Sequence, residues 1–79
     1  MSNKLQPDRK LDCLGLYCPE PVFRTRMELD KMKAGEVLEV IADDPAADPD
    51  INSLVKTLGY EVLDFRKENE KIIFLIKKK

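Results

Sequence analysis

The spacing of hydrophobic residues changes along the chain. In some segments every second residue is hydrophobic, as in a strand, and in others the spacing is that of a helix. Over residues 10–14, Leu11 and Cys13 fall on one side and charged residues on the other, which predicts a half-buried strand. From residue 19 to about residue 33 the period becomes helical. Residues 37–42 are apolar enough to predict a central strand.

The helical segment divides into an apolar stripe and a polar face. The stripe consists of Val22, Thr25, Leu29 and Met32, with Phe23 and Met27 beside it. Arg24, Glu28 and Lys31 fall on the opposite face. This division predicts a helix that packs one side against a sheet and ends before Gly35.

A second helix and a hairpin are predicted in the C-terminal half. Residues 43–49 read as a loop, and Asp48 or Asp50 is the predicted N-cap of a helix that ends at Gly59. Its apolar stripe consists of Ile51, Leu54, Val55 and Leu58. Residues 60–66 alternate in polarity, with Tyr60, Val62 and Asp64 on one side and Glu61, Leu63 and Phe65 on the other. Together with a turn at residues 67–70 and an apolar run over residues 71–77, they predict two paired strands, followed by a short solvated tail of lysines.

The predicted order is βαβαββ. We therefore expect an α+β fold, a two-layer α/β sandwich with two helices on one face of a four-stranded mixed sheet. Residues 1–8 are predicted to form a disordered tail and residues 9–79 a single domain.

Composition excludes several kinds of chemistry. The 79 residues include 14 Lys and Arg, 15 Asp and Glu, two Cys and no His, with a net charge of −1. Without histidine, a Cys–His nucleophilic pair or a usual four-ligand zinc site cannot form within the chain. No glycine-rich nucleotide motif occurs, and we predict neither a metal nor another cofactor. The near-neutral charge argues against DNA binding and leaves a specific RNA site open.

The expected compartment is the cytoplasm. The N-terminal segment lacks the apolar core of a signal peptide, and no apolar run is long enough to span a membrane. In a reducing compartment a stable disulfide between Cys13 and Cys18 would be unusual, whereas a transient one remains open.

The most informative feature is Cys18, which precedes the helical segment in the run Cys-Pro-Glu-Pro. The residue before a proline avoids the α region, so Cys18 is predicted at the N-cap, with Pro19 and Pro21 in the first and third helical positions. There the unpaired N–H groups and the helix dipole favour a thiolate. Glu20 is then predicted to offer the only local N–H to that thiolate.

Neighbouring charges act on Cys18 in opposite directions. Glu20 opposes formation of the thiolate, whereas Arg24 and Arg26 favour it if their side chains fold back toward the N-terminus of the helix. Cys13 is most simply a small core residue, with a role as a second, resolving thiol as the alternative. Asp43, Asp44, Asp48 and Asp50 are interpreted as a solvated loop and a helix cap rather than a metal site.

The run from Leu11 to Pro21, Leu-Asp-Cys-Leu-Gly-Leu-Tyr-Cys-Pro-Glu-Pro, resembles the signature of the TusA/SirA-like sulfur carriers, Leu-Asp-x-x-Gly-Leu-x-Cys-Pro-x-Pro. The resemblance extends to the end of the chain. It implies the same sandwich fold, similar to the C-terminal domain of bacterial translation initiation factor three. It also implies that Cys18 carries a persulfide and that Arg26 occupies a basic position around the cysteine. Pro49 departs from the pattern, because the best-known members have an arginine there.

The resemblance also implies the partners. A sulfur donor protein, either a cysteine desulfurase or a rhodanese, would load Cys18, and an acceptor protein would take the sulfur for tRNA thiolation, cofactor synthesis or other sulfur trafficking. The chain would act as a monomeric relay rather than as a stand-alone enzyme. Two alternatives are a dithiol redox protein that uses Cys13 and Cys18, and a small RNA-binding or regulatory module.

Overall fold

The computed structural model describes residues 7–17 and 19–79. Its elements follow the predicted order: β1 (Arg9–Cys13), α1 (Glu20–Lys31), β2 (Val37–Ala42), α2 (Ala47–Leu58), β3 (Glu61–Glu68) and β4 (Lys71–Lys77). The described part of the chain contains no helix with the length and apolar character of a membrane span.

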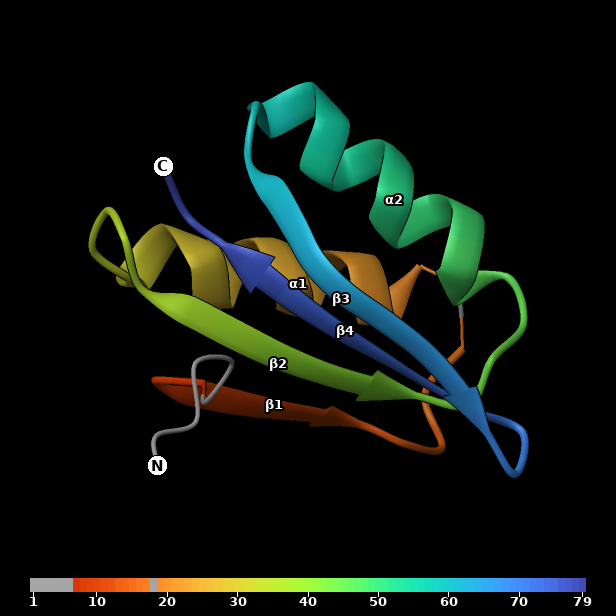
Figure 1. Cartoon of the computed structure of the whole chain (residues 1–79). Helices are drawn as coiled ribbons and strands as arrows, with labels where there is room; N and C mark the ends of the chain where they lie inside the picture. Colours follow the sequence, from red (N-terminus) through yellow and green to blue (C-terminus); the bar gives the residue numbers. More distant parts are fainter. Residues whose placement is uncertain (1–6, 18) are drawn as a thin grey trace, which may run out of the picture.

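The four strands form one mixed sheet in the order β1-β2-β4-β3 (Figure 1). β1 is parallel to β2, whereas β4 is antiparallel to both of its neighbours, β2 and β3. β2 is therefore an interior strand, as its apolar sequence predicts. The α+β sandwich inferred from the hydrophobic periods is confirmed.

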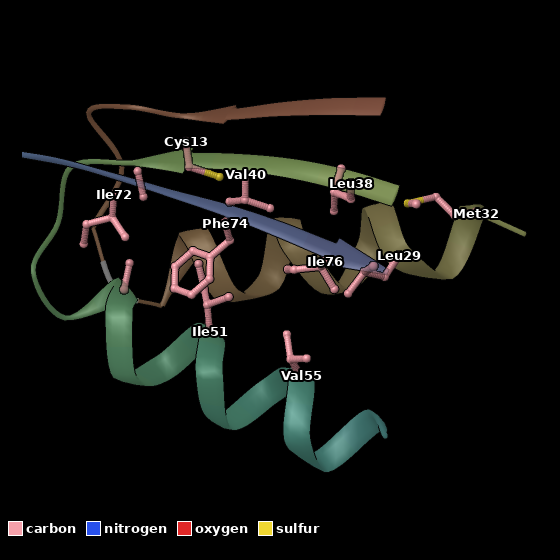
Figure 2. Packing of buried hydrophobic residues seen from close by; sticks show 12 residues of the cluster. Cys13, Leu29, Met32, Leu38, Val40, Ile51, Val55, Ile72, Phe74 and Ile76 are labelled. Atoms are coloured by element: carbon pink, nitrogen blue, oxygen red, sulfur yellow. The ribbon is translucent and has the colours of Figure 1, made fainter. Parts of the chain in front are cut away.

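The core lies between the sheet and the two helices (Figure 2). Alternate residues of the interior strands β2 and β4 contribute to it because successive side chains of a strand point to opposite faces. These residues are Leu38, Val40, Ala42, Ile72, Phe74 and Ile76, and the helices add Leu29, Met32, Ile51 and Val55. The predicted stripes of both helices thus face the sheet.

A β-bulge in β3 changes the predicted alternation. Val62 lies opposite Ile76, but the register then shifts, so that Asp64 lies opposite Leu75 and Phe65 opposite Phe74. An extra residue in one strand reverses which side chains share a face. Phe65 consequently packs against Phe74, with ring centroids 5.0 Å apart. The prediction that Asp64 shares a face with Val62 is wrong.

The hairpin between β3 and β4 is tighter than predicted. β3 continues to Glu68, so the turn consists of Asn69 and Glu70 alone. Both have positive φ angles, 49° and 65°, which is typical of two-residue hairpin turns. At the end of α2, Gly59 adopts the left-handed conformation with a φ of 78°, as expected for a helix stop.

α2 begins earlier than predicted. Ala46 occupies its N-cap without a side-chain hydrogen bond, so the prediction that Asp48 or Asp50 caps the helix is wrong. Both carboxylates lie in the first turn, where they complement the helix dipole. The entry to the helix is organised instead by Asp44, whose carbonyl accepts from the Ala47 N–H at 2.9 Å.

The predicted N-terminal tail is partly bonded to the sheet. The N–H of Asp8 donates to the carbonyl of Val37 at 2.8 Å, and the Val37 N–H donates to Asp8 Oδ2 at 2.8 Å. Asp8, which the prediction places in the tail, is thus bonded to β2. Residues 1–6 of the predicted tail lie outside the described residues.

Candidate functional site

The loop between β1 and α1 leads directly to Cys18, which itself lies outside the described residues. Two carboxylates hold this loop. Asp12 Oδ1 accepts from the Leu14 N–H at 2.9 Å, and Asp43 Oδ1 accepts from the Gly15 N–H at 3.0 Å. Gly15 has a φ of 80°, a conformation that residues with a side chain rarely adopt. The loop that leads to Cys18 is therefore held by one hydrogen bond within the loop and by a second one to the loop after β2.

The first turn of α1 differs by one residue from the prediction. Its first backbone hydrogen bond runs from the Phe23 N–H to the Pro19 carbonyl at 3.1 Å, which makes Pro19 the N-cap residue. Pro19 is not the first helical residue and Pro21 occupies the second helical position rather than the third. The predicted N-cap, Cys18, therefore precedes the cap.

Glu20 does not have the predicted free N–H. This group donates to the carbonyl of Tyr17 at 2.8 Å, so the prediction that it serves Cys18 is wrong. The bond ties Tyr17 to the start of α1. Pro21 has no N–H, and its carbonyl accepts from Thr25 Oγ1 at 2.7 Å within the core.

Charged side chains on α1 are arranged partly as pairs. Arg24 Nε lies 3.3 Å from Glu20 Oε1, so the two charges that are predicted to act oppositely on Cys18 form an exposed ion pair with each other. Arg26 is exposed, and within residues 7–17 and 19–79 no ion pair involves it. Its predicted place beside Cys18 stays a prediction.

Cys13 is fully buried at the end of β1, where it joins the core beside Val40 (Figure 2). Burial raises the pKa of this thiol, and the nearby positive charge of Arg24 opposes that shift only in part. Cys13 is therefore held as a neutral thiol, as the core interpretation predicts. Such a group is a poor nucleophile.

Three loops gather at the end of the sheet where β1 and β2 finish (Figure 1). The loop before Cys18 is bonded to the loop after β2 through Asp43. A cavity of about 610 Å³ lies between that second loop and the turn of the β3–β4 hairpin. It is lined by Asp43, Pro45, Lys67, Glu68, Asn69, Glu70, Lys71 and Ile72. The loop from Leu14 to Tyr17 therefore lies at this end of the molecule.

The acidic residues near this end serve the fold. Asp43 and Asp44 accept backbone hydrogen bonds, and Asp48 accepts from Asn52 and pairs with Lys67 at 3.7 Å. The described residues contain no cluster of His, Cys, Asp and Glu that could hold a metal ion. The part played by Asp43 was missed from the sequence, because it lies 28 residues from Gly15 and no local motif reports the contact.

Comparison with known families identifies the family of the chain. A family model described as "Sulfurtransferase TusA" matches residues 9–78, which include the whole of both loops and α1. The chain belongs to the TusA family. In this TusA family chain the loop held by Asp12 and Asp43 and the Cys-Pro-Glu-Pro run both lie within the matched residues.

Individual relatives agree with this assignment. A protein of Archaeoglobus fulgidus named "Putative sulfur carrier protein" is 49% identical over 70 residues, covering 87% of this chain and 91% of that protein. Sulfur carrier protein TusA of Allochromatium vinosum is 42% identical over 71 residues, covering 90% and 93% of the two chains. The crystal structure of a SirA-like protein from Desulfitobacterium hafniense superposes with a TM-score of 0.79 at 27% identity, covering 87% of this chain and 95% of that one.

Proposed function

We propose that this chain is a cytoplasmic sulfur carrier that accepts persulfide sulfur on Cys18 and passes it to an acceptor protein. The observation that carries the proposal is the match to the TusA family across residues 9–78, which contains the Cys-Pro-Glu-Pro run. Both relatives described above are named as sulfur carriers.

The proposed reaction moves one sulfur atom without net oxidation. The Cys18 thiolate attacks the outer sulfur of a donor persulfide, a new S–S bond forms at Cys18, and the donor's S–S bond breaks. The donor cysteine leaves as a thiolate. An acceptor nucleophile then attacks the outer sulfur of the Cys18 persulfide, and Cys18 leaves as a thiolate in turn.

The local architecture supports this chemistry. A relay cysteine must meet large protein partners, which requires a protruding and well-held segment. Asp12 and Asp43 hold the loop that enters Cys18, and the bond from the Glu20 N–H to Tyr17 holds the chain that leaves it. Pro19, Pro21 and Glu20 act as supporting residues that stiffen the turn.

The burial of Cys13 argues against the alternative of a dithiol redox protein. A resolving thiol must ionise and reach its partner, whereas the Cys13 side chain is fully buried and its pKa is raised by burial. We therefore assign Cys13 to the core. We place the donor among cysteine desulfurases and rhodaneses, and the final use of the sulfur in tRNA thiolation, cofactor synthesis or other sulfur trafficking.

Mass spectrometry tests the proposal. The chain is incubated with a cysteine desulfurase and L-cysteine, or with a rhodanese and thiosulfate, and then digested without reductant. We expect the peptide that carries Cys18 to gain the mass of one sulfur atom. The Cys18→Ser variant should gain none, while the Cys13→Ala variant should be loaded like the unmodified chain.

The same measurement can refute the assignment. If neither protein donor nor inorganic polysulfide adds sulfur to Cys18, the chain is not a sulfur carrier. A mass loss that corresponds to a bond between Cys13 and Cys18 would instead favour the redox alternative. RNA binding that survives Cys18→Ala would favour the RNA-binding module.

A further inference from the structure

The sheet has an open outer face with an apolar centre. Both helices cover the opposite face (Figure 1), and no helix or strand of the described residues packs on the outer one. Strand alternation assigns Ile41, Ile73 and Leu75 to the outer face, because each lies next to a residue of the core cluster. Leu75 is only 4% exposed and yet lies outside that cluster. The interior strands therefore carry apolar side chains on the side away from the helices.

The strand register arranges the residues of the outer face in rows, two of which cross all four strands. The first central row, from β1 to β3, consists of Lys10, Glu39, Leu75 and Asp64. The second, in the same direction, consists of Asp12, Ile41, Ile73 and Arg66. Each row thus has opposite charges at its two ends, and the order of the charges is reversed between the two rows.

Charged side chains line the two edges of this face. Lys10 and Asp12 on β1 are exposed, and within residues 7–17 and 19–79 no ion pair involves either of them. On β3, Arg66 is exposed and lies 3.6 Å from the carboxylate of Asp64 and 3.6 Å from that of Glu68. In the two central rows, each edge therefore presents one positive and one negative charge.

We propose that two copies of this chain pack their outer sheet faces together around a two-fold axis parallel to the strands. Such an axis places β1 of one copy opposite β3 of the other and keeps each row opposite the same row. The proposal departs from the monomer that the family resemblance implies, and it does not depend on the proposed sulfur transfer. Opposed residues are then complementary, each contact occurring twice: Lys10 with Asp64, Asp12 with Arg66, and Ile41 with Ile73.

Charges near the ends of the strands favour this axis. A two-fold axis across the strands would also join opposite charges in the central rows, but it would place Lys77 opposite Lys71 and Glu61 opposite Glu68. The axis along the strands avoids both of these repulsive contacts. It opposes Asp8 to Glu61 at one corner, where two twisted sheets that pack at about 30° diverge.

The dimer should be weak. Four strands about 4.8 Å apart form a small face, and an interface of that size lies below the area of stable complexes. Glu39 in the central row also has to lie opposite Leu75. We therefore expect a Kd on the order of 0.1 mM. The axis leaves both helices uncovered and places the two loops that lead to Cys18 at the same end of the dimer.

Sedimentation equilibrium with reductant, from about 10 μM to about 2 mM protein, measures the association. We compare the unmodified chain, Lys10→Glu, Asp64→Lys and an equimolar mixture of these two variants. In the proposed dimer, each variant alone opposes like charges at both contacts, whereas a pair with one copy of each variant opposes unlike charges at both. The matched controls are Lys56→Glu and Asp30→Lys, which place the same changes on exposed positions of the helices.

We expect the unmodified chain to change from monomer to dimer as its concentration rises. Each variant alone should dimerise about tenfold or more weakly, because like charges are opposed twice. The mixture should return to within about threefold of the unmodified chain. The two controls and Cys18→Ser should dimerise like the unmodified chain, and circular dichroism should show that each variant is folded. In the unmodified chain, the NMR signals that shift with concentration should belong to the two central rows.

Several results would overturn the dimer. The unmodified chain would remain a monomer up to about 2 mM, or its NMR shifts would fall on the helices. Dimerisation that neither Lys10→Glu nor Asp64→Lys weakens, or that the controls weaken equally, would place the contact elsewhere. A mixture that does not recover would exclude the axis along the strands, because an axis across them opposes Lys10 to Asp12 and leaves the mixed pair repelled. Each of these results leaves the proposed loading of Cys18 untouched.

Discussion

Asp43 joins two loops that lie far apart in the chain. Its carboxylate accepts from the Gly15 N–H at 3.0 Å, and the loop that it holds leads to Cys18. The contact is on the surface, so water can replace it and its net contribution to stability is modest. Its importance lies in positioning, because a loop that is held in one conformation presents its nucleophile without a search.

We therefore expect Asp43→Ala to slow the loading of Cys18 more than it lowers stability. Urea unfolding should show a loss of about 1 kcal/mol, typical of one exposed hydrogen bond. Loading by inorganic polysulfide, followed by mass spectrometry, should slow several-fold. Asp43→Asn keeps an oxygen acceptor and should restore most of the rate. Asp30→Ala, an exposed change on α1, serves as the control, and loading that is unaffected in Asp43→Ala would contradict the positioning role.

At the scale of elements, the end of α1 is held by the other end of the chain. The Lys78 Nζ donates to the carbonyls of Leu29 and Met32 at 2.7 and 2.8 Å. The Leu29 carbonyl also accepts from the N–H of Met32, the C-cap residue, at 3.1 Å, and the positive charge of Lys78 complements the negative end of the helix dipole. The Gly35 N–H donates to the Lys78 carbonyl at 2.6 Å, so the chain beyond β4 is bonded both to the end of α1 and to the loop that follows it.

Lys78→Met should consequently lower the free energy of unfolding by about 1–3 kcal/mol, because it removes two partly buried, charge-assisted hydrogen bonds and keeps the aliphatic part of the side chain. Urea unfolding monitored by circular dichroism measures the loss. Lys79→Met, an exposed change one residue away, should have little effect. Equal stability of the two variants would mean that the lysine contributes no cap.

The local periodicity of the sequence is enough to predict the order of the helices and strands. It does not predict the contacts of Lys78 or the β-bulge in β3. The stripes through Leu29 and through Ile51 and Val55 are set by each helix alone, so the sequence predicts them correctly. The Lys78 cap spans 46 to 49 residues, and the bulge after Val62 depends on how β3 pairs with β4. No local sequence pattern indicates either the cap or the bulge. The sequence accordingly predicts Lys78 as part of a solvated tail, and Phe65 on the side of the strand opposite Val62.

The candidate site shows the same limit. The Cys-Pro-Glu-Pro run predicts the candidate site from the sequence, and each proline restricts the backbone next to it. The N-cap nevertheless falls on Pro19, and the Glu20 N–H bonds to Tyr17. Both outcomes depend on how the loop returns to the helix, which Asp43 helps to decide from 28 residues away. Likewise, the exposure of Phe23 and Met27 follows from how α1 is rotated on the sheet.

At the scale of the whole molecule, the burial of Cys13 in the core makes the stability of the fold depend on pH. Its thiol lies in the hydrophobic cluster that joins the sheet to both helices, and burial raises its pKa above the usual value for cysteine. The folded chain therefore keeps this proton at pH values where the unfolded chain has released it. Because the unfolded state then binds fewer protons, the stability of the fold decreases as the pH rises through that window.

We expect this decrease to disappear when Cys13 is replaced. The comparison is made in a Cys18→Ser background, so that Cys13 is the only thiol, between the chain with Cys13 and its Cys13→Ala variant. At neutral pH the chain with Cys13 should be the more stable, because alanine leaves a small cavity in the core. Above the ordinary thiol pKa its advantage should shrink, by at most about 1.4 kcal/mol per pH unit for one proton.

Urea unfolding at a series of alkaline pH values measures the two free energies. All other ionisable groups are common to both chains, so their effects cancel in the difference. A difference that stays constant with pH would mean that Cys13 ionises as easily in the folded chain as in the unfolded one. That result would remove the argument that confines Cys13 to the core, and with it the main objection to a second reactive thiol next to the turn that carries Cys18.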